Sequence, residues 1–201
     1  MSRSITLNGI YILGGIHNKH IKADPRVDNE YERLRQTSQV QCEITEPSSS
    51  LTISLLNVRS LRKHSIDVKH DSNIVKADMI CFTETQLLPT CNDSEIRTNL
   101  YPFRLYRQDH VSDRYSSLAI CFKHNLQTRE YNYFPDTNAF KFDVVNNMKP
   151  VPITILLLYH KHSSNISQYI NSVRCVLNNH KVDIMLGDFN INYLNDNEVK
   201  P

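Results

Sequence analysis

The sequence predicts an α+β fold in which short strands and two interspersed helices build a layered sheet. Several apolar runs are too short for typical helices and suit buried strands. Two other segments follow residues that commonly cap helices, and the second of them carries apolar residues at the spacing of an amphipathic helix. No internal repeat is visible.

The composition places few limits on function. With 201 residues, the chain can hold one medium-sized domain or a smaller domain with a tail. The formal net charge of +2 does not by itself indicate nucleic-acid binding. Positive charge is clustered locally in two places, of which the first is a candidate nucleic-acid contact: Arg59, Arg62 and Lys63, and then His160, Lys161 and His162.

The five cysteines do not form a metal-binding motif, because no two of them are close enough for a Cys-x-x-Cys pair. Cys81 and Cys121 lie inside apolar runs and are expected to be buried free thiols, which is typical of a reducing compartment. No apolar run reaches the length of about 18 residues that a membrane span needs, and the N-terminus has no signal-peptide pattern. We therefore expect a soluble, intracellular protein with no membrane contact.

The first 50 residues differ from the rest. In residues 1–36, one short strand at Ile10–Leu13 is followed by a charged segment, and a stretch this small cannot bury a core of its own. Residues 37–50 are polar and end in Pro47–Ser50, a composition typical of a linker. We therefore expect a domain over residues 51–201 and a preceding segment that does not pack against it.

From Leu51 onward the apolar pattern is regular. The first strand ends at Asn57, and Ser60 can cap a helix over residues 62–76. A second helix should follow the possible cap residues 163–165 and end at Asn178-Asn179. The remaining strand candidates are residues 77–83, 104–107, 117–123, 140–144, 153–158 and 182–186.

Four of the predicted strands deliver polar residues at their C-terminal ends. The last apolar run stops at Gly187, where the backbone gains freedom, and Asp188 and Asn190 follow. Because residues two apart in an extended chain share a face, this carboxylate and this amide project the same way. The other three strands deliver Asn57, Glu84 and Tyr159.

Each of these polar residues alone has a simple structural explanation, such as a turn or a solvated strand end. If these residues gather at one edge of a sheet, they also have a chemical explanation. Carboxylate and amide oxygens are hard donors that suit Mg²⁺ with several waters retained. Such a site can stabilise the charge that grows on a phosphodiester while a tyrosine hydroxyl or an amide holds a phosphate oxygen.

The ordered set of motifs resembles the endonuclease/exonuclease/phosphatase superfamily, in the apurinic-type endonuclease form of mobile elements. The motifs are Leu56–Leu61, Asp78–Thr85, Leu157–Tyr159 and Gly187–Asn190. The resemblance implies a four-layer α/β sandwich of two mixed sheets, Mg²⁺ or Mn²⁺ as cofactor and DNA as partner. It also implies a role for each strand-end residue: Glu84 and Asn57 would bind the metal ion, Tyr159 would contact the scissile phosphate, Asp188 would orient or activate the attacking water, and Asn190 would stabilise the transition state.

The N-terminal segment resembles the extreme C-terminus of a petite-integration-frequency-type DNA helicase. The resemblance lies in Met1–Arg3, Leu7–Leu13, Ile21–Asp24 and Glu30–Leu34, and it would give Arg3 a contact with the ATP γ-phosphate. The phosphate loop and the motor cores of that family are absent, so we expect no ATPase activity. A helicase end joined to this nuclease resembles a helitron-type transposon protein, which implies a fragment of a larger polyprotein and a nuclear location.

The chain departs from the nuclease pattern at two points. Tyr115–Ser117 replaces the family's glycine-rich turn, and the chain stops at Pro201 without the family's closing Ser-Asp-His motif. We therefore expect a C-terminally truncated domain that cleaves DNA near background, with His160 and His162 facing solvent or phosphate. Two alternatives stay open: a non-catalytic transposon relic that binds DNA weakly through the first basic cluster, or a phosphatase of the same fold.

Overall fold

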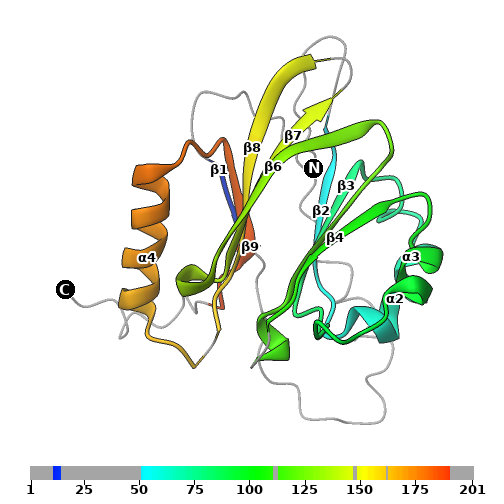
Figure 1. Ribbon diagram of the computed structural model, residues 1–201, viewed down its shortest axis with the longest axis horizontal. Helices are drawn as coiled ribbons and strands as arrows, with labels where there is room; N and C mark the ends of the chain where they lie inside the picture. Colours follow the sequence, from blue (N-terminus) through cyan, green and yellow to red (C-terminus); the bar gives the residue numbers. More distant parts are fainter. Residues whose placement is uncertain (1–10, 15–50, 111–112, 147–148, 162, 191–201) are drawn as a thin grey trace.

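The computed structural model describes residues 11–14, 51–110, 113–146, 149–161 and 163–190. Within these ranges two β-sheets face each other, and helices lie against their outer faces (Figure 1). The prediction of layered sheets with interspersed helices is confirmed at this level. The structure is a mixed α/β fold with two sheets and few helices, and each sheet contains both parallel and antiparallel pairs.

One sheet has five strands in the order β1-β9-β8-β7-β6. Parallel pairing joins β1 to β9 and β9 to β8, whereas β8, β7 and β6 pair antiparallel. The strand bounds are Tyr11–Gly14 for β1, Leu126–Phe134 for β6, Ala139–Asn146 for β7, Lys149–Tyr159 for β8 and Ile184–Asp188 for β9.

The other sheet has four strands in the order β2-β3-β5-β4. Here β2 and β3 are parallel, and β5 runs antiparallel to both of its neighbours. The strand bounds are Ile53–Asn57 for β2, Met79–Thr83 for β3, Arg104–Gln108 for β4 and Leu118–Phe122 for β5.

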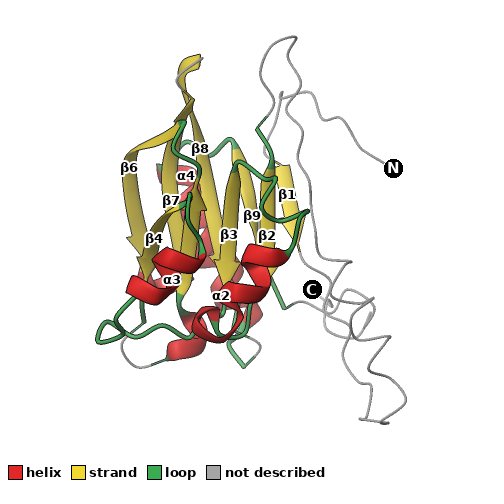
Figure 2. Cartoon of the chain, turned by 90° about the vertical axis from the view of Figure 1, so that its right-hand side faces the viewer, coloured by secondary structure: helices red, strands yellow, loops and turns green. Residues whose placement is uncertain are grey.

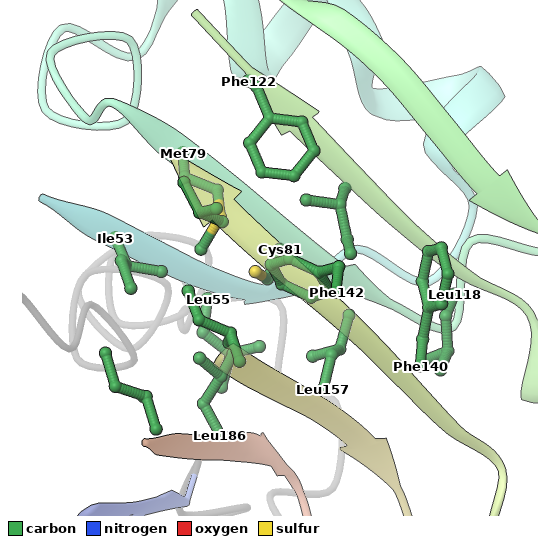
Figure 3. Close-up of a cluster of buried hydrophobic side chains, with 14 of the residues drawn as sticks. Ile53, Leu55, Met79, Cys81, Leu118, Phe122, Phe140, Phe142, Leu157 and Leu186 are labelled. Atoms are coloured by element: carbon green, nitrogen blue, oxygen red, sulfur yellow. The ribbon is translucent and has the colours of Figure 1, made fainter. Parts of the chain in front are cut away.

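The main core lies between the two sheets. Figure 3 shows side chains of the four-stranded sheet, such as Met79 and Phe122, near side chains of the five-stranded sheet, such as Phe142 and Leu157. All four are buried. Burying apolar surface of this kind contributes about 25 cal/mol per Å², so this interface is the main favourable term that aligns the sheets.

Smaller apolar clusters fix the helices to the outer faces. Helices α2 (Leu61–His70) and α3 (Ser94–Asn99) cover the four-stranded sheet, as Figure 2 shows from the side, and α4 (Ile166–Asn179) covers the five-stranded sheet. The predicted cap of α4 is present, because the Asn165 side chain accepts a hydrogen bond from the Gln168 amide. Two short 3₁₀ turns, η2 (Arg114–Ser116) and η3 (Pro135–Thr137), complete the described elements.

The structure differs from the sequence-based prediction at four elements. Helix α2 ends at His70 rather than at residue 76, because the Asp71 carboxylate accepts hydrogen bonds from the Asn73 and Ile74 amides and turns the chain. Strand β6 and the short helix α3 were not predicted. Strand β1 pairs with β9, which contradicts the expectation that nothing in residues 1–50 packs against the domain.

Among the described residues, no helix combines the length and the apolar character that a bilayer crossing requires.

Candidate functional site

The polar strand ends meet because the strands that carry them are parallel within each sheet. In the four-stranded sheet, Asn57 at the end of β2 pairs in register with Thr83, the residue before Glu84. In the five-stranded sheet, Tyr159 at the end of β8 pairs in register with Asp188 at the end of β9. Each sheet therefore presents one pair of the predicted site residues at one edge.

A single amide connects the two pairs. The Asn57 side-chain nitrogen donates to Glu84 Oε1 at 2.8 Å and to Asp188 Oδ2 at 2.7 Å. The Tyr159 hydroxyl donates to the same Glu84 oxygen at 3.1 Å. The structure thus brings Asn57, Glu84, Tyr159 and Asp188 into one hydrogen-bonded cluster that spans both sheets.

The turns after β2 and β3 hold each other in place. Backbone amides of the first turn donate to carbonyls of the second: Val58 to Thr83 at 3.1 Å, Ser60 to Glu84 at 3.0 Å, and Leu61 to Thr85 at 2.9 Å. Both turns contain non-glycine residues with positive φ, among them 44° at Arg59 and 52° at Glu84. Such a conformation costs about 1–2 kcal/mol per residue, and the surrounding hydrogen bonds maintain it.

Gly187 allows β9 to approach β8 closely enough to place Asp188. A Cβ atom at Gly187 would meet the carbonyl oxygen of Leu158 and would lie 2.8 Å from its carbonyl carbon. Only glycine fits there without moving the backbone of β8. The Asp188 residue that follows is 4% exposed, so its charge needs hydrogen-bond donors or a cation.

Asn190 lies beside Asp188, and its side-chain nitrogen contacts backbone. The Asn190 amide donates to Asp188 Oδ1 at 3.3 Å, and its Nδ2 donates to the carbonyl oxygen of His160 at 2.8 Å. With a φ of 46°, this residue closes the turn that leaves β9. In this arrangement Asn190 positions the ends of β8 and β9 relative to each other.

His160 is buried, so the expectation that it faces solvent or phosphate is wrong. It is 3% exposed, and its backbone amide donates to the Asp188 carbonyl at 2.9 Å, which extends the pairing of β8 with β9. The imidazole Nδ1 lies 2.9 Å from the Phe189 carbonyl, and because a carbonyl only accepts, we assign the proton to Nδ1. Its ring packs on Tyr169 at 4.4 Å between centroids. His162 lies outside the described residues.

The electrostatic surroundings keep the Tyr159 hydroxyl protonated. Burial raises the pKa of Tyr159 above its ordinary range, and the negative charges of Glu84, Asp188 and Asp113 raise it further. Tyr159 therefore acts as a hydrogen-bond donor at neutral pH, not as a base.

The predicted basic contact lies next to this cluster. Arg59 is exposed in the turn two residues after Asn57, and Arg62 and Lys63 are exposed on the first turn of α2. Their charges border the β2 side of the site.

Two residues that support Glu84 escaped the sequence analysis. The Ser117 hydroxyl donates to the Leu87 carbonyl at 2.8 Å, and the Ser117 carbonyl accepts from the Thr85 amide at 3.1 Å. Arg107 donates to the carbonyl of Cys91 at 3.0 Å. These contacts fix the segment that follows Glu84. Since most of them involve backbone atoms, no pattern of residue types in the sequence predicts them.

The chemistry of the cluster suits a hard divalent cation. Glu84, Asp188 and the Asn57 amide offer oxygen donors, and Mg²⁺ uses only one or two carboxylates while it keeps several waters. In the part of the chain that the structure describes, no three histidine, cysteine, aspartate or glutamate side chains group as a metal site. Because the donors of the cluster are carboxylate and amide oxygens, they match the ligand preference of Mg²⁺ rather than that of a metal that prefers sulfur or imidazole.

No family model matches the chain, and no curated protein matches its sequence. Solved structures do share its fold. It is similar to an endonuclease/exonuclease/phosphatase family protein from Bacteroides thetaiotaomicron, with a TM-score of 0.56 and 12% identity over 74% of this chain and 64% of that one. It is also similar to D. rerio TDP2 complexed with a single-strand DNA product, with a TM-score of 0.51 and 14% identity over 71% of this chain and 61% of that one.

A third similar structure is the mannosyl-6-phosphatase Bt3783 of B. thetaiotaomicron, with a TM-score of 0.53 and 10% identity over 73% of this chain and 68% of that one. The chain spans less than two thirds of the length of the first two proteins. At these identities the comparisons establish the fold, which is that of the endonuclease/exonuclease/phosphatase proteins, and nothing finer.

Proposed function

We propose that this protein is a Mg²⁺-dependent phosphodiesterase that acts on DNA. The observation that carries the proposal is the bridge of Asn57 Nδ2 between Glu84 and Asp188, which joins carboxylates of both sheets in one cluster. Two carboxylates held this close are costly without a cation or donors, and the surrounding residues are arranged to keep them there.

Each residue has a distinct role in this proposal. Glu84, with the side-chain oxygen of Asn57, would hold the metal ion, which supplies Lewis-acid stabilisation of the charged phosphate when bound. The Tyr159 hydroxyl would turn from Glu84 and donate its one proton to a phosphate oxygen, and its raised pKa keeps that proton in place. Asp188 orients the attacking water, and Asn190 supports Asp188 and stabilises the transition state.

Two kinds of support favour a DNA substrate. Arg59, Arg62 and Lys63 are exposed beside the cluster, where they can contact the phosphate backbone. One protein of similar fold was solved with a single-strand DNA product. Another protein of similar fold is a sugar phosphatase, so hydrolysis of a phosphate monoester is the competing activity.

The proposal extends to a role in a mobile element. Its support is the sequence alone, in the Asn57–Leu61 and Thr83–Thr85 motifs and in the helicase-like series of the N-terminal segment.

Two measurements on the full chain test the proposal. Millimolar Mg²⁺ should raise the thermal unfolding midpoint, and this increase should disappear in Glu84→Gln, because the carboxylate that holds the ion is lost. We expect wild type to nick plasmid DNA only slightly above background, and this Mg²⁺-dependent nicking should disappear in the same variant because the metal-holding carboxylate is lost. Glu95→Gln, a change at an exposed glutamate of α3, is the matched control and should alter neither result.

Equal Mg²⁺ stabilisation and equal nicking in wild type and Glu84→Gln would overturn the proposal. Faster hydrolysis of a sugar phosphate than of DNA, with the same dependence on Glu84, would replace it with the phosphatase alternative.

A further inference from the structure

The η2 turn is held in a fixed conformation by the residue before it. The Asp113 carboxylate accepts hydrogen bonds from the Tyr115 amide and from the Ser116 hydroxyl, both at 3.1 Å. The Asp113 carbonyl also accepts from the Ser116 amide at 2.9 Å. Because three hydrogen bonds converge on one residue, the backbone at Tyr115 is preorganised.

This turn is fastened to the end of β8, where Tyr159 lies. The Asn138 side chain donates to the Ser116 carbonyl at 2.8 Å, and the Asn138 carbonyl accepts from the Tyr159 amide at 3.2 Å. Lys161 Nζ lies 2.8 Å from Asp113 Oδ2. The charge of Asp113 also contributes to the raised pKa of Tyr159, as expected for groups that are close together.

The turn is fastened to the other sheet as well. Ser117, the residue after η2, accepts a hydrogen bond from the amide of Thr85, next to Glu84. The η2 turn therefore lies between the end of β3 and the end of β8, at the rim of the candidate site.

Two side chains at this rim remain accessible. Tyr115 is 44% exposed, and the Lys161 side chain is 51% exposed. An ammonium group has three hydrogen-bond donors, so its contact with Asp113 leaves capacity for a further acceptor. The rim thus offers an aromatic ring on a fixed backbone and a cation, and Asp113 contacts both the Tyr115 amide and Lys161 Nζ.

We propose that Tyr115 and Lys161 form a nucleotide subsite that selects DNA with an unpaired base next to the scissile phosphate. The Tyr115 ring stacks on the base, and Lys161 contacts a neighbouring backbone phosphate. This inference rests on the proposed function, because it assigns the substrate class of the same site.

The chemistry of the two groups favours a polynucleotide over a small phosphate ester. Stacking requires the face of a base, which a sugar phosphate lacks. A second phosphate at a short distance occurs in a nucleic-acid strand and not in a monoester. A paired base in a duplex hides its face between its neighbours, so the subsite fits single-stranded or frayed DNA.

Binding of a labelled single-stranded oligodeoxynucleotide, measured by fluorescence anisotropy in EDTA, tests the inference without any catalytic step. Tyr115→Ala should weaken binding by about 5- to 100-fold, and Tyr115→Phe should bind like wild type, because stacking needs the ring and not the hydroxyl. For an oligonucleotide of the same length without bases, wild type and Tyr115→Ala should bind equally.

Tyr101→Ala is the matched control. Tyr101 is 74% exposed and precedes β4, which runs in the same direction as β3, so it lies at the opposite end of the four-stranded sheet from Glu84. This variant should bind the oligonucleotide like wild type. Lys161→Ala should reduce the salt dependence of binding by a slope of about 0.7.

Equal binding of the base-containing oligonucleotide by wild type and Tyr115→Ala would overturn the inference. The same loss with the base-free strand would also overturn it, because the effect would not come from stacking. The proposed function fails separately: Mg²⁺ stabilisation that persists in Glu84→Gln refutes the metal site, whatever Tyr115→Ala does to binding.

Discussion

The Asn57 side-chain nitrogen lies 2.7 Å from Asp188 Oδ2, although 131 residues separate the two in the chain. One residue ends a strand of the four-stranded sheet, and the other ends a strand of the five-stranded sheet. The hydrogen bond between them therefore forms only when the two sheets are correctly aligned. The geometry of the site therefore depends on the tertiary fold and not on any one local segment.

Asn57→Ala should destabilise the protein by about 2–4 kcal/mol, because it removes a donor shared by two carboxylates and leaves them facing each other. Urea unfolding at neutral pH measures this loss. Asn179→Ala removes a hydrogen bond at an exposed position of α4, and it should cost less than about 1 kcal/mol. Equal losses in the two variants would contradict the assigned role of Asn57.

Gly187→Ala should cost about 2–4 kcal/mol, because the added Cβ meets the backbone of Leu158 and forces β8 and β9 apart. Ile184→Val, at the start of the same strand, should cost only about 0.5–1.5 kcal/mol. Thermal unfolding of both variants provides the comparison. A Gly187→Ala protein as stable as wild type would show that the two strands separate without loss.

Tyr159→Phe should change the pH dependence of stability. The folded protein holds the pKa of Tyr159 above its unfolded value of about 10, so the unfolded state loses this proton first as the pH rises. The resulting stabilisation is complete below pH 10 and is lost above it. The stability gap between wild type and Tyr159→Phe should narrow by about 1.4 kcal/mol per pH unit above that point.

Urea unfolding at several pH values on both sides of 10 measures this gap. A gap that stays constant with pH would mean that Tyr159 titrates alike in the folded and unfolded protein.

Ser117→Ala should destabilise the protein by about 1–3 kcal/mol, because the buried hydroxyl donates to the Leu87 carbonyl and accepts from the His110 amide. It should also lower the Mg²⁺-induced rise in the unfolding midpoint, since these contacts hold the segment after Glu84. Ser163→Ala at an exposed position is the control. An unchanged Mg²⁺-induced rise in the unfolding midpoint would show that Ser117 does not help to position Glu84.

The sequence predicts most strands because burial on both faces leaves a continuous apolar run. Strand β3 is buried throughout, and so is β9, and both runs are visible in the sequence. Strand β6 was missed because it lies at an edge of the sheet, where exposed polar residues such as Gln127 and Asn132 hide the pattern. Helix α3 has only six residues, which is too short for a helical period to appear.

The four strand-end residues of the cluster could be predicted because each lies within two residues of the end of an apolar run. Their supporting residues could not. The contacts of Ser117 and Arg107 involve mainly backbone carbonyls and amides of other segments, and any sequence can supply those. The burial of His160 also escaped prediction, because it depends on α4 placing Tyr169 over the imidazole.

The positive φ angles of Arg59, Glu84 and Asn190 carry one more consequence. A fold selected only for stability would place glycine at such positions, since glycine alone enters this region without steric cost. The chain instead has a cation, a carboxylate and an amide at these positions, and none of its four glycines lies there. At these residues stability therefore competes with the proposed activity, and selection for a more thermostable variant would replace these side chains first.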